Sequence, residues 1–255
     1  MTADSLIEAM ALPAHTRVDQ RVAKKLLLEN GAPTAADKRI INDGIEELIW
    51  VAALKPESIG VPSFRDATRE YLEIAVLSLS LRSGAKAVRL RELVHRAIPY
   101  PLALVSTISN GMTFSMAHLR KAENDSSKIV LDGGIVGVSV TSDEVDTAFL
   151  KHLSLAGLPK ENLFSLYQGW FDRITALDAA RYTGSFALAS SRGVTERWQI
   201  SVREIARLDV EIAALRANAE KTTQLNRRVE MNLELRRLQD ERLQFLAQLG
   251  KGDSE

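Results

Sequence analysis

Cysteine is absent from the 255-residue sequence. Its absence excludes disulfide bonds, thiolate zinc sites, iron–sulfur clusters and a cysteine nucleophile, and it fits a reducing compartment. Long apolar runs are also missing: no stretch approaches about 18 apolar residues without a charge, so the sequence predicts no membrane-spanning helix. The first ten residues carry two acidic and no basic side chains, unlike a signal peptide, and we expect a cytoplasmic protein.

An excess of either charge is missing too. The 33 Lys and Arg residues balance the 33 Asp and Glu residues. A zero net charge argues against a protein that coats nucleic acid or an anionic membrane by bulk electrostatics, although it permits a local basic patch. With 45% hydrophobic residues the chain can build a core, and its length predicts one or two domains.

Proline and glycine are missing from the last part of the chain. All seven prolines lie at or before Pro159, and neither residue type occurs between Val194 and Leu249. This asymmetry predicts a mixed domain over residues 1–185, a small-residue linker over 186–193 and a long coiled-coil helix over 194–250.

Within the mixed domain, the spacing of apolar residues changes between helical and strand-like. Helical spacing predicts helices over 18–28, 35–54, 88–98, 141–157 and 161–182. Branched or alternating runs predict strands over 72–81, 102–109, 112–119, 128–131 and 135–140. Asn110-Gly111 is a hairpin signal, and Asp132-Gly-Gly134 reads as a turn or a bulge. Together these elements predict an α+β fold, in which helices pack on a small, mainly antiparallel sheet.

The tail has two heptad registers. Ile205, Leu208, Ile212 and Leu215 begin the first register, which continues through polar positions to Leu233 and fails at Arg236, while a second register starts at Met231. Such a narrow apolar stripe needs a helical partner. A parallel dimer could pair Asn226 with its twin, whereas a hairpin would bend near Thr222-Thr223. Because glycine is absent there, the sequence favours a continuous helix and an intermolecular partner. The predicted interface residues are Ile205, Leu208, Ile212, Leu215, Asn226 and Val229.

Motifs that carry chemistry are weak. The sequence has no phosphate-binding glycine loop, no HExxH and no GxSxG, and no two histidines have the spacing of metal ligands on a helix. We therefore assign no catalytic, metal-binding or cofactor-binding residue and expect no cofactor. His95 lies in the last turn of its predicted helix, where a positive charge would complement the helix dipole. The candidate nucleic-acid contacts are Arg96, His118, Arg120 and Lys121.

Several segments resemble one bacterial family across nearly the whole chain. The most distinctive are His95-Arg-Ala-Ile-Pro-Tyr-Pro101 and Gln224-Leu-Asn-Arg-Arg-Val-Glu230, supported by Thr34-Ala-Ala-Asp-Lys38 and Ile45-Glu-Glu-Leu-Ile-Trp50. They are similar to the bacterial domain-of-unknown-function 4391 family. The resemblance implies a genomic setting beside helicase and DNA methyltransferase genes of restriction and phage-defence islands.

Two classes of function follow. The first is a non-catalytic accessory subunit of a DNA restriction-modification or phage-defence complex, which uses its coiled coil to form a homo-oligomer or to bind a helicase or DNA methyltransferase. The second is a metal-dependent nuclease or other DNA-processing enzyme with a scattered active site. The accessory subunit is favoured by the absence of a catalytic motif, by the zero net charge and by the long helix that requires a partner.

Overall fold

The computed structural model describes residues 2–109, 111–222 and 224–250. The chain divides into two compact units, Met1–Ile174 and Thr175–Glu255. The sequence places the boundary later, at the linker over 186–193; the division instead falls within one helix, α7 (Leu163–Thr183). No helix among the described residues is long and apolar enough to cross a membrane.

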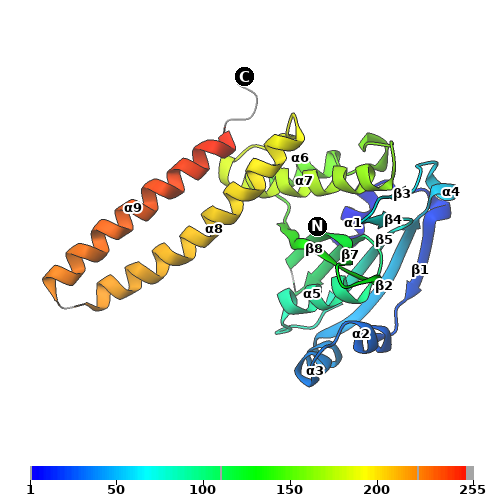
Figure 1. The fold of residues 1–255 in the computed structure, drawn as a ribbon, viewed down its shortest axis with the longest axis horizontal. Helices are drawn as coiled ribbons and strands as arrows, with labels where there is room; N and C mark the ends of the chain where they lie inside the picture. The colour runs from blue at the N-terminus through cyan, green and yellow to red at the C-terminus, as the bar shows by residue number, and fades with distance from the viewer. Residues whose placement is uncertain (1, 110, 223, 251–255) are drawn as a thin grey trace. The chain divides into compact units, whose positions relative to one another are not determined.

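A mainly antiparallel sheet forms the centre of the first unit (Figure 1). Its strand order is β1-β2-β5-β6-β7-β8, with β5 and β6 parallel and the other neighbours antiparallel. The strands are β1 (Arg17–Arg21), β2 (Ile45–Leu54), β5 (Ile74–Leu81), β6 (Leu102–Ile108), β7 (Gly111–Ala122) and β8 (Asp125–Val140). A two-stranded sheet joins β3 (Phe64–Arg65) to β4 (Glu70–Tyr71). The mixed class and the mainly antiparallel sheet are therefore confirmed.

Two helix predictions near the N-terminus are wrong. The predicted helix over 35–54 is helix α3 (Ala35–Gly44) followed by β2, because Gly44 lies tightly against helix α5 (Ala87–Ala97) and the branched run after it pairs with β5. A Cβ atom at Gly44 would lie 2.7 Å from Leu90 Cδ1. The predicted helix over 18–28 is likewise divided between β1 and α2 (Lys24–Asn30).

The remaining elements of the first unit follow the predicted order more closely. The described part of β6 and β7 confirms the predicted strand pair, although Asn110 of the hairpin signal lies outside the described residues. Asp132-Gly-Gly134 is a bulge within β8, where Gly133 has φ +84° and the register to β7 shifts. The predicted helix over 141–157 is the shorter helix α6 (Glu144–Lys151), which is capped by Asp143, while Thr141 donates to Asp146.

Helices cover both faces of the sheet (Figure 1). α2, α3 and α5 (Ala87–Ala97) share a core with β2, β5 and β6 on one face, including Leu27, Ile41, Leu90 and Leu93. α1 (Ala3–Ala9), α6 and the first part of α7 lie on the other face, where Tyr167 donates to the carbonyl of Leu102. Short elements complete the unit: η1 (Ala14–Thr16), α4 (Pro56–Ile59) and η2 (Leu155–Gly157).

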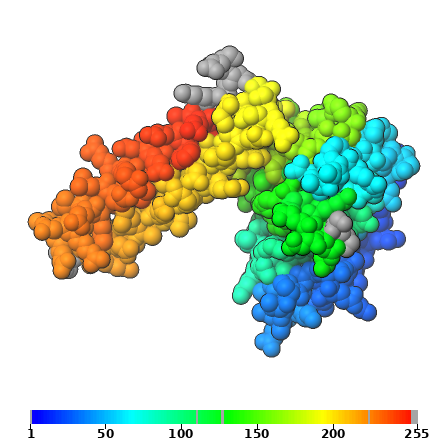
Figure 2. All heavy atoms as spheres, in the orientation of Figure 1, coloured from blue at the N-terminus to red at the C-terminus, as the bar shows by residue number. Residues whose placement is uncertain are grey.

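The second unit is a helical hairpin. Its helices α8 (Arg192–Lys221) and α9 (Leu225–Gly250) lie side by side and run in opposite directions (Figure 2). Ser201 near the start of α8 donates to Gln248 near the end of α9, and Thr222 contacts Met231 at the other end. The favoured continuous helix is therefore wrong and the hairpin alternative is correct: α8 ends at Lys221, and Leu238 and Phe245 of the second register pack in one cluster with Leu208 of α8.

Candidate functional site

A charged cluster on the α7 face of the sheet begins at the turn between β3 and β4. Asp66 accepts hydrogen bonds from the backbone N–H groups of Thr68 and Arg69, at 2.7 and 2.6 Å. These bonds lower the pKa of Asp66 and close the turn. The turn holds Arg69 so that its guanidinium lies 5.5 Å from the ring centre of Phe164 and reaches β8.

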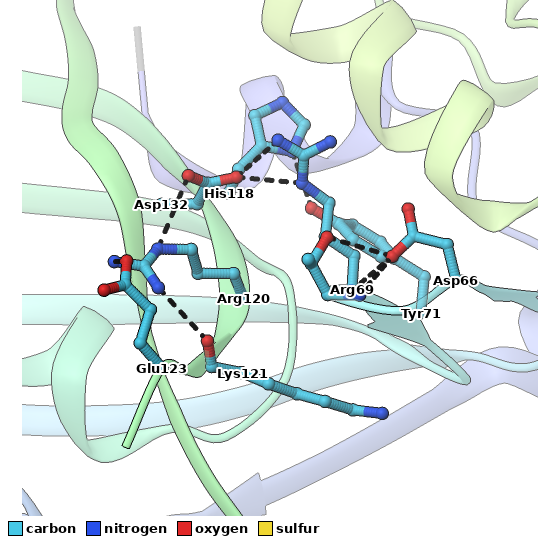
Figure 3. A network of polar contacts seen from close by, with 9 residues as sticks. Asp66, Arg69, Tyr71, His118, Arg120, Lys121, Glu123 and Asp132 are labelled. Atoms are coloured by element: carbon cyan, nitrogen blue, oxygen red, sulfur yellow. Dashed lines mark hydrogen bonds and ion pairs between the residues drawn. The ribbon is translucent and has the colours of Figure 1, made fainter. Parts of the chain in front are cut away.

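Asp132 is the acceptor at the centre of this cluster (Figure 3). Arg69 Nε donates to its Oδ2 at 2.8 Å, and Arg120 Nε lies 3.8 Å from its Oδ1. Arg120 also pairs with Glu123 at 3.3 Å. The hydrogen bond to Asp132 raises the pKa of Arg69. Two arginines thus share nearby carboxylates, and little uncompensated positive charge remains for a phosphate.

His118 lies beside this cluster but belongs to an aromatic core. Its Nδ1 lies 2.6 Å from the hydroxyl oxygen of Tyr71, and its ring centre lies 4.7 Å from that of Phe171 and 5.3 Å from that of Tyr167. Burial raises the pKa of Tyr71, so its hydroxyl stays protonated and can donate to His118. The arrangement fixes the imidazole within the layer between β7 and α7.

The structure separates the four candidate nucleic-acid contacts. His118 and Arg120 project to the α7 face of β7, whereas Lys121 must point to the other face because side chains alternate along a strand. In Figure 3 the Lys121 side chain extends away from the cluster. Arg96 lies on α5, across the sheet, and pairs with Glu92 at 3.0 Å. The structure therefore does not bring the four candidates together on one face, and contact with nucleic acid by any one of these residues stays a prediction.

A groove of about 570 Å³ lies where α5 ends above β7 and β8; it is lined by Arg96, Ile129 and Val130 among others. At its base His95 Nε2 lies 3.1 Å from Ser115 Oγ, and both side chains are buried. Burial, aided by the charge of Arg91, lowers the pKa of His95 to about 3. The predicted role of His95 as a cation at the helix end is therefore wrong, because the ring is neutral and ties α5 to β7.

Acidic residues do not converge in the described ranges. No group of three or more histidine, aspartate or glutamate side chains there is placed to hold a metal ion. Asp132, the most enclosed acid of the charged cluster, is engaged by two arginines. Nothing in that geometry supports the nuclease alternative.

The predicted interface residues of the tail divide into two groups. Leu208 and Ile212 pack against Leu238 of α9, with Leu215 beside them, and Ile205 lies in a neighbouring core. The hairpin therefore supplies the helical partner that this stripe requires. Arg242, an unexpected charge in the second register, donates from Nε to Asp209 Oδ1 at 2.6 Å across the hairpin.

Asn226 and Val229 behave differently, because both are exposed on α9. The parallel pairing of Asn226 with its twin rested on the continuous helix and is not supported. Outer residues of α8 are also exposed, notably Val210 at 71%. Sequence reasoning missed the outer positions of α8 because neither of the two apolar registers includes them.

The comparisons with known proteins identify a family and nothing closer. No curated protein and no solved structure matches the chain significantly. The family profile described as "Domain of unknown function (DUF4391)" matches residues 10–241, which includes the whole sheet and most of the hairpin. The chain belongs to this DUF4391 family.

Proposed function

We propose that the protein is a non-catalytic accessory subunit of a bacterial DNA restriction-modification or phage-defence complex. In this proposal the hairpin docks onto a helicase or a DNA methyltransferase. The defence setting comes from the family resemblance of the sequence. The single observation that carries the docking role is the outer face of α8, which exposes apolar side chains that the hairpin does not need for its own core.

The outer face of α8 is defined by Ala206, Val210, Ala213 and Ala217, which are all exposed. Their spacing of four, three and four residues places them on one side of the helix, opposite the buried positions Leu208 and Ile212. Three of the four side chains are methyl groups, so a partner helix can approach the α8 backbone closely. The outer face thus has the width and the size of side chain that helix packing requires.

The charged cluster of the first unit favours a protein contact over a nucleic-acid contact. Arg69, Arg120 and Arg96 each pair with a carboxylate within 4 Å, and the chain has no net charge. Nucleic-acid affinity at physiological salt depends on basic side chains that are available to phosphates. To bind phosphates, these arginines would first have to break their ion pairs with carboxylates.

The test is affinity capture of the full-length chain from its native host, with the retained proteins identified by mass spectrometry. We expect a helicase or a DNA methyltransferase that wild type retains and that the Val210→Asp variant loses. Arg216→Asp is the matched control, because Arg216 is exposed on α8 outside the outer face and has no ion pair within the described residues. Capture of neither enzyme, or capture that Val210→Asp leaves unchanged, would contradict the proposal.

A further inference from the structure

A second exposed stripe lies on α9, on the side that faces away from α8. We call it the outer seam of α9, and its members are Val229, Leu233, Arg236, Asp240, Leu243 and Ala247. All six are exposed, and the three large apolar side chains are 50%, 66% and 59% accessible. The spacing of four, three, four, three and four residues places them on one helix face. Leu238 and Leu249, the buried residues of α9, lie on the opposite face.

The outer seam is chemically self-complementary when it is read in reverse. Along α9 it runs as two apolar residues, a cation, an anion and two apolar residues. Suppose that α9 of a second copy lies antiparallel to this α9, with the two-fold axis at the level of residue 238 along the helix. Val229 then lies opposite Ala247, Leu233 opposite Leu243 and Arg236 opposite Asp240 of the other copy. Each pairing occurs twice, once on each side of the two-fold axis, as an isologous interface requires.

The two charged residues of the seam are available for such a contact. Arg237 pairs with Glu234 at 2.6 Å and Arg242 pairs with Asp209 at 2.6 Å. In contrast, the ion pairs between described residues include neither Arg236 nor Asp240, although the two lie one turn apart. Arginine four residues before aspartate is the less favourable order for an intrahelical pair, which leaves both charges facing solvent.

Charge also selects the direction of pairing. A parallel, in-register pair would set Arg236 against its twin and Asp240 against its twin, which is repulsive. The antiparallel pair replaces both repulsions with two opposite-charge contacts and keeps Leu233 against Leu243 on either side. Charge complementarity therefore favours a second copy of this chain, in the antiparallel orientation, as the occupant of the seam.

We propose that the outer seam of α9 is a two-fold, antiparallel homodimer interface. The seam extends over 18 residue steps, or about 27 Å of helix. The area that one helix pair of this length buries lies at the small end of specific interfaces. We therefore expect a dissociation constant of about the micromolar range. The interface uses α9 alone, does not depend on the proposed docking of α8, and leaves the outer face of α8 free for another protein.

The experiment is sedimentation equilibrium of the full-length chain at several concentrations, with a charge-swap series. Wild type should change from monomer towards dimer as concentration rises. Arg236→Asp and Asp240→Arg should each weaken the dimer at least about tenfold, because each replaces two attractive contacts with two repulsive ones. An equimolar mixture of these two variants should form a heterodimer, since one copy then carries two anions and the other two cations.

The controls distinguish pairing through the outer seam from a general effect of charge on the hairpin. Arg216→Asp changes the same charge on α8 and should leave the dimer intact, as should Val210→Asp, which tests the docking proposal. Far-UV circular dichroism should be the same for all variants, because every substituted side chain is exposed. A wild type that stays monomeric at all concentrations would overturn the proposal, and so would a dimer that the single swaps leave unchanged or a mixture that does not associate.

Discussion

Leu208→Ala should loosen the hairpin without unfolding the first unit. Leu208 is fully buried and packs with Ile212 and Leu238 in the middle of the hairpin. Removing a buried leucine side chain typically costs about 2–5 kcal/mol, and the cost is lowest where the site can collapse. Because only two helices surround this site, we expect about 2–3 kcal/mol.

Hydrogen exchange read by mass spectrometry is the suitable assay, because two units need not unfold together. A loss of about 2–3 kcal/mol corresponds to amide exchange about 30- to 150-fold faster in peptides from α8 and α9. Peptides from β5 and β6 should exchange as in wild type. Val210→Ala is the matched control on the same helix: Val210 is 71% exposed and alanine is the better helix former, so exchange should not accelerate.

A double substitution tests whether the two helices pack as described. Leu208→Ala and Leu238→Ala remove partners in one cluster, so their effects should differ from additivity by about 0.5–3 kcal/mol. Equal exchange in the Leu208→Ala and Val210→Ala variants would refute the hairpin core. Strict additivity of the two leucine substitutions would show that the residues do not share a contact.

Three further predictions concern the first unit. Arg173→Met should destabilise this unit by about 3–5 kcal/mol in urea denaturation, because the guanidinium of Arg173 donates to the carbonyls of His152, Gly169 and Gly157, which would lose their donors. Arg173→Lys should retain only part of the stability that Arg173 provides. His95 has a folded-state pKa of about 3 against 6.5 unfolded, so wild type should lose stability as pH falls from 6.5 towards 3, by up to about 1.4 kcal/mol per pH unit, and His95→Gln should flatten this slope. Asp132→Asn should tighten any low-salt DNA binding by releasing Arg69 and Arg120, and Arg120→Glu should weaken it for every sequence in a gel-shift assay; no binding by wild type would remove the prediction.

Apolar patterning predicted the elements that are bounded by clear proline or glycine signals. β5, α5 and the pair β6–β7 are examples, as is most of α7. β2 was missed because it lies between β1 and β5 and is buried on alternating and on consecutive positions, including Val51 and Ala52. Its apolar residues therefore fit a helix template as well as a strand, and only the partner strand decides between them.

The charged cluster could not be predicted from local pattern. Arg69 and Asp132 are separated by 63 residues, and the turn that holds Arg69 only acquires its role when β7 and β8 lie beside it. The surroundings of His118 could not be predicted from its neighbours in sequence either. Its neighbours in sequence, Arg120 and Lys121, suggested a basic strand end, whereas α7 supplies the aromatic rings that surround it. Long-range packing, which composition does not encode, decides which charged groups are enclosed.

The tail shows why an interrupted heptad can carry information. The first register continues from α8 into α9 and fails at Arg236, which looks like the end of a coiled coil when the tail is one helix. Once the chain turns back, the second register from Met231 to Leu249 packs against α8, and the first register continues on the opposite face of α9 as the outer seam. Arg236 and Asp240 then occupy its centre rather than its end. A charge pair at the centre of an apolar stripe lowers affinity but fixes orientation. In the proposed antiparallel homodimer, Arg236 and Asp240 therefore set one orientation at some cost in affinity.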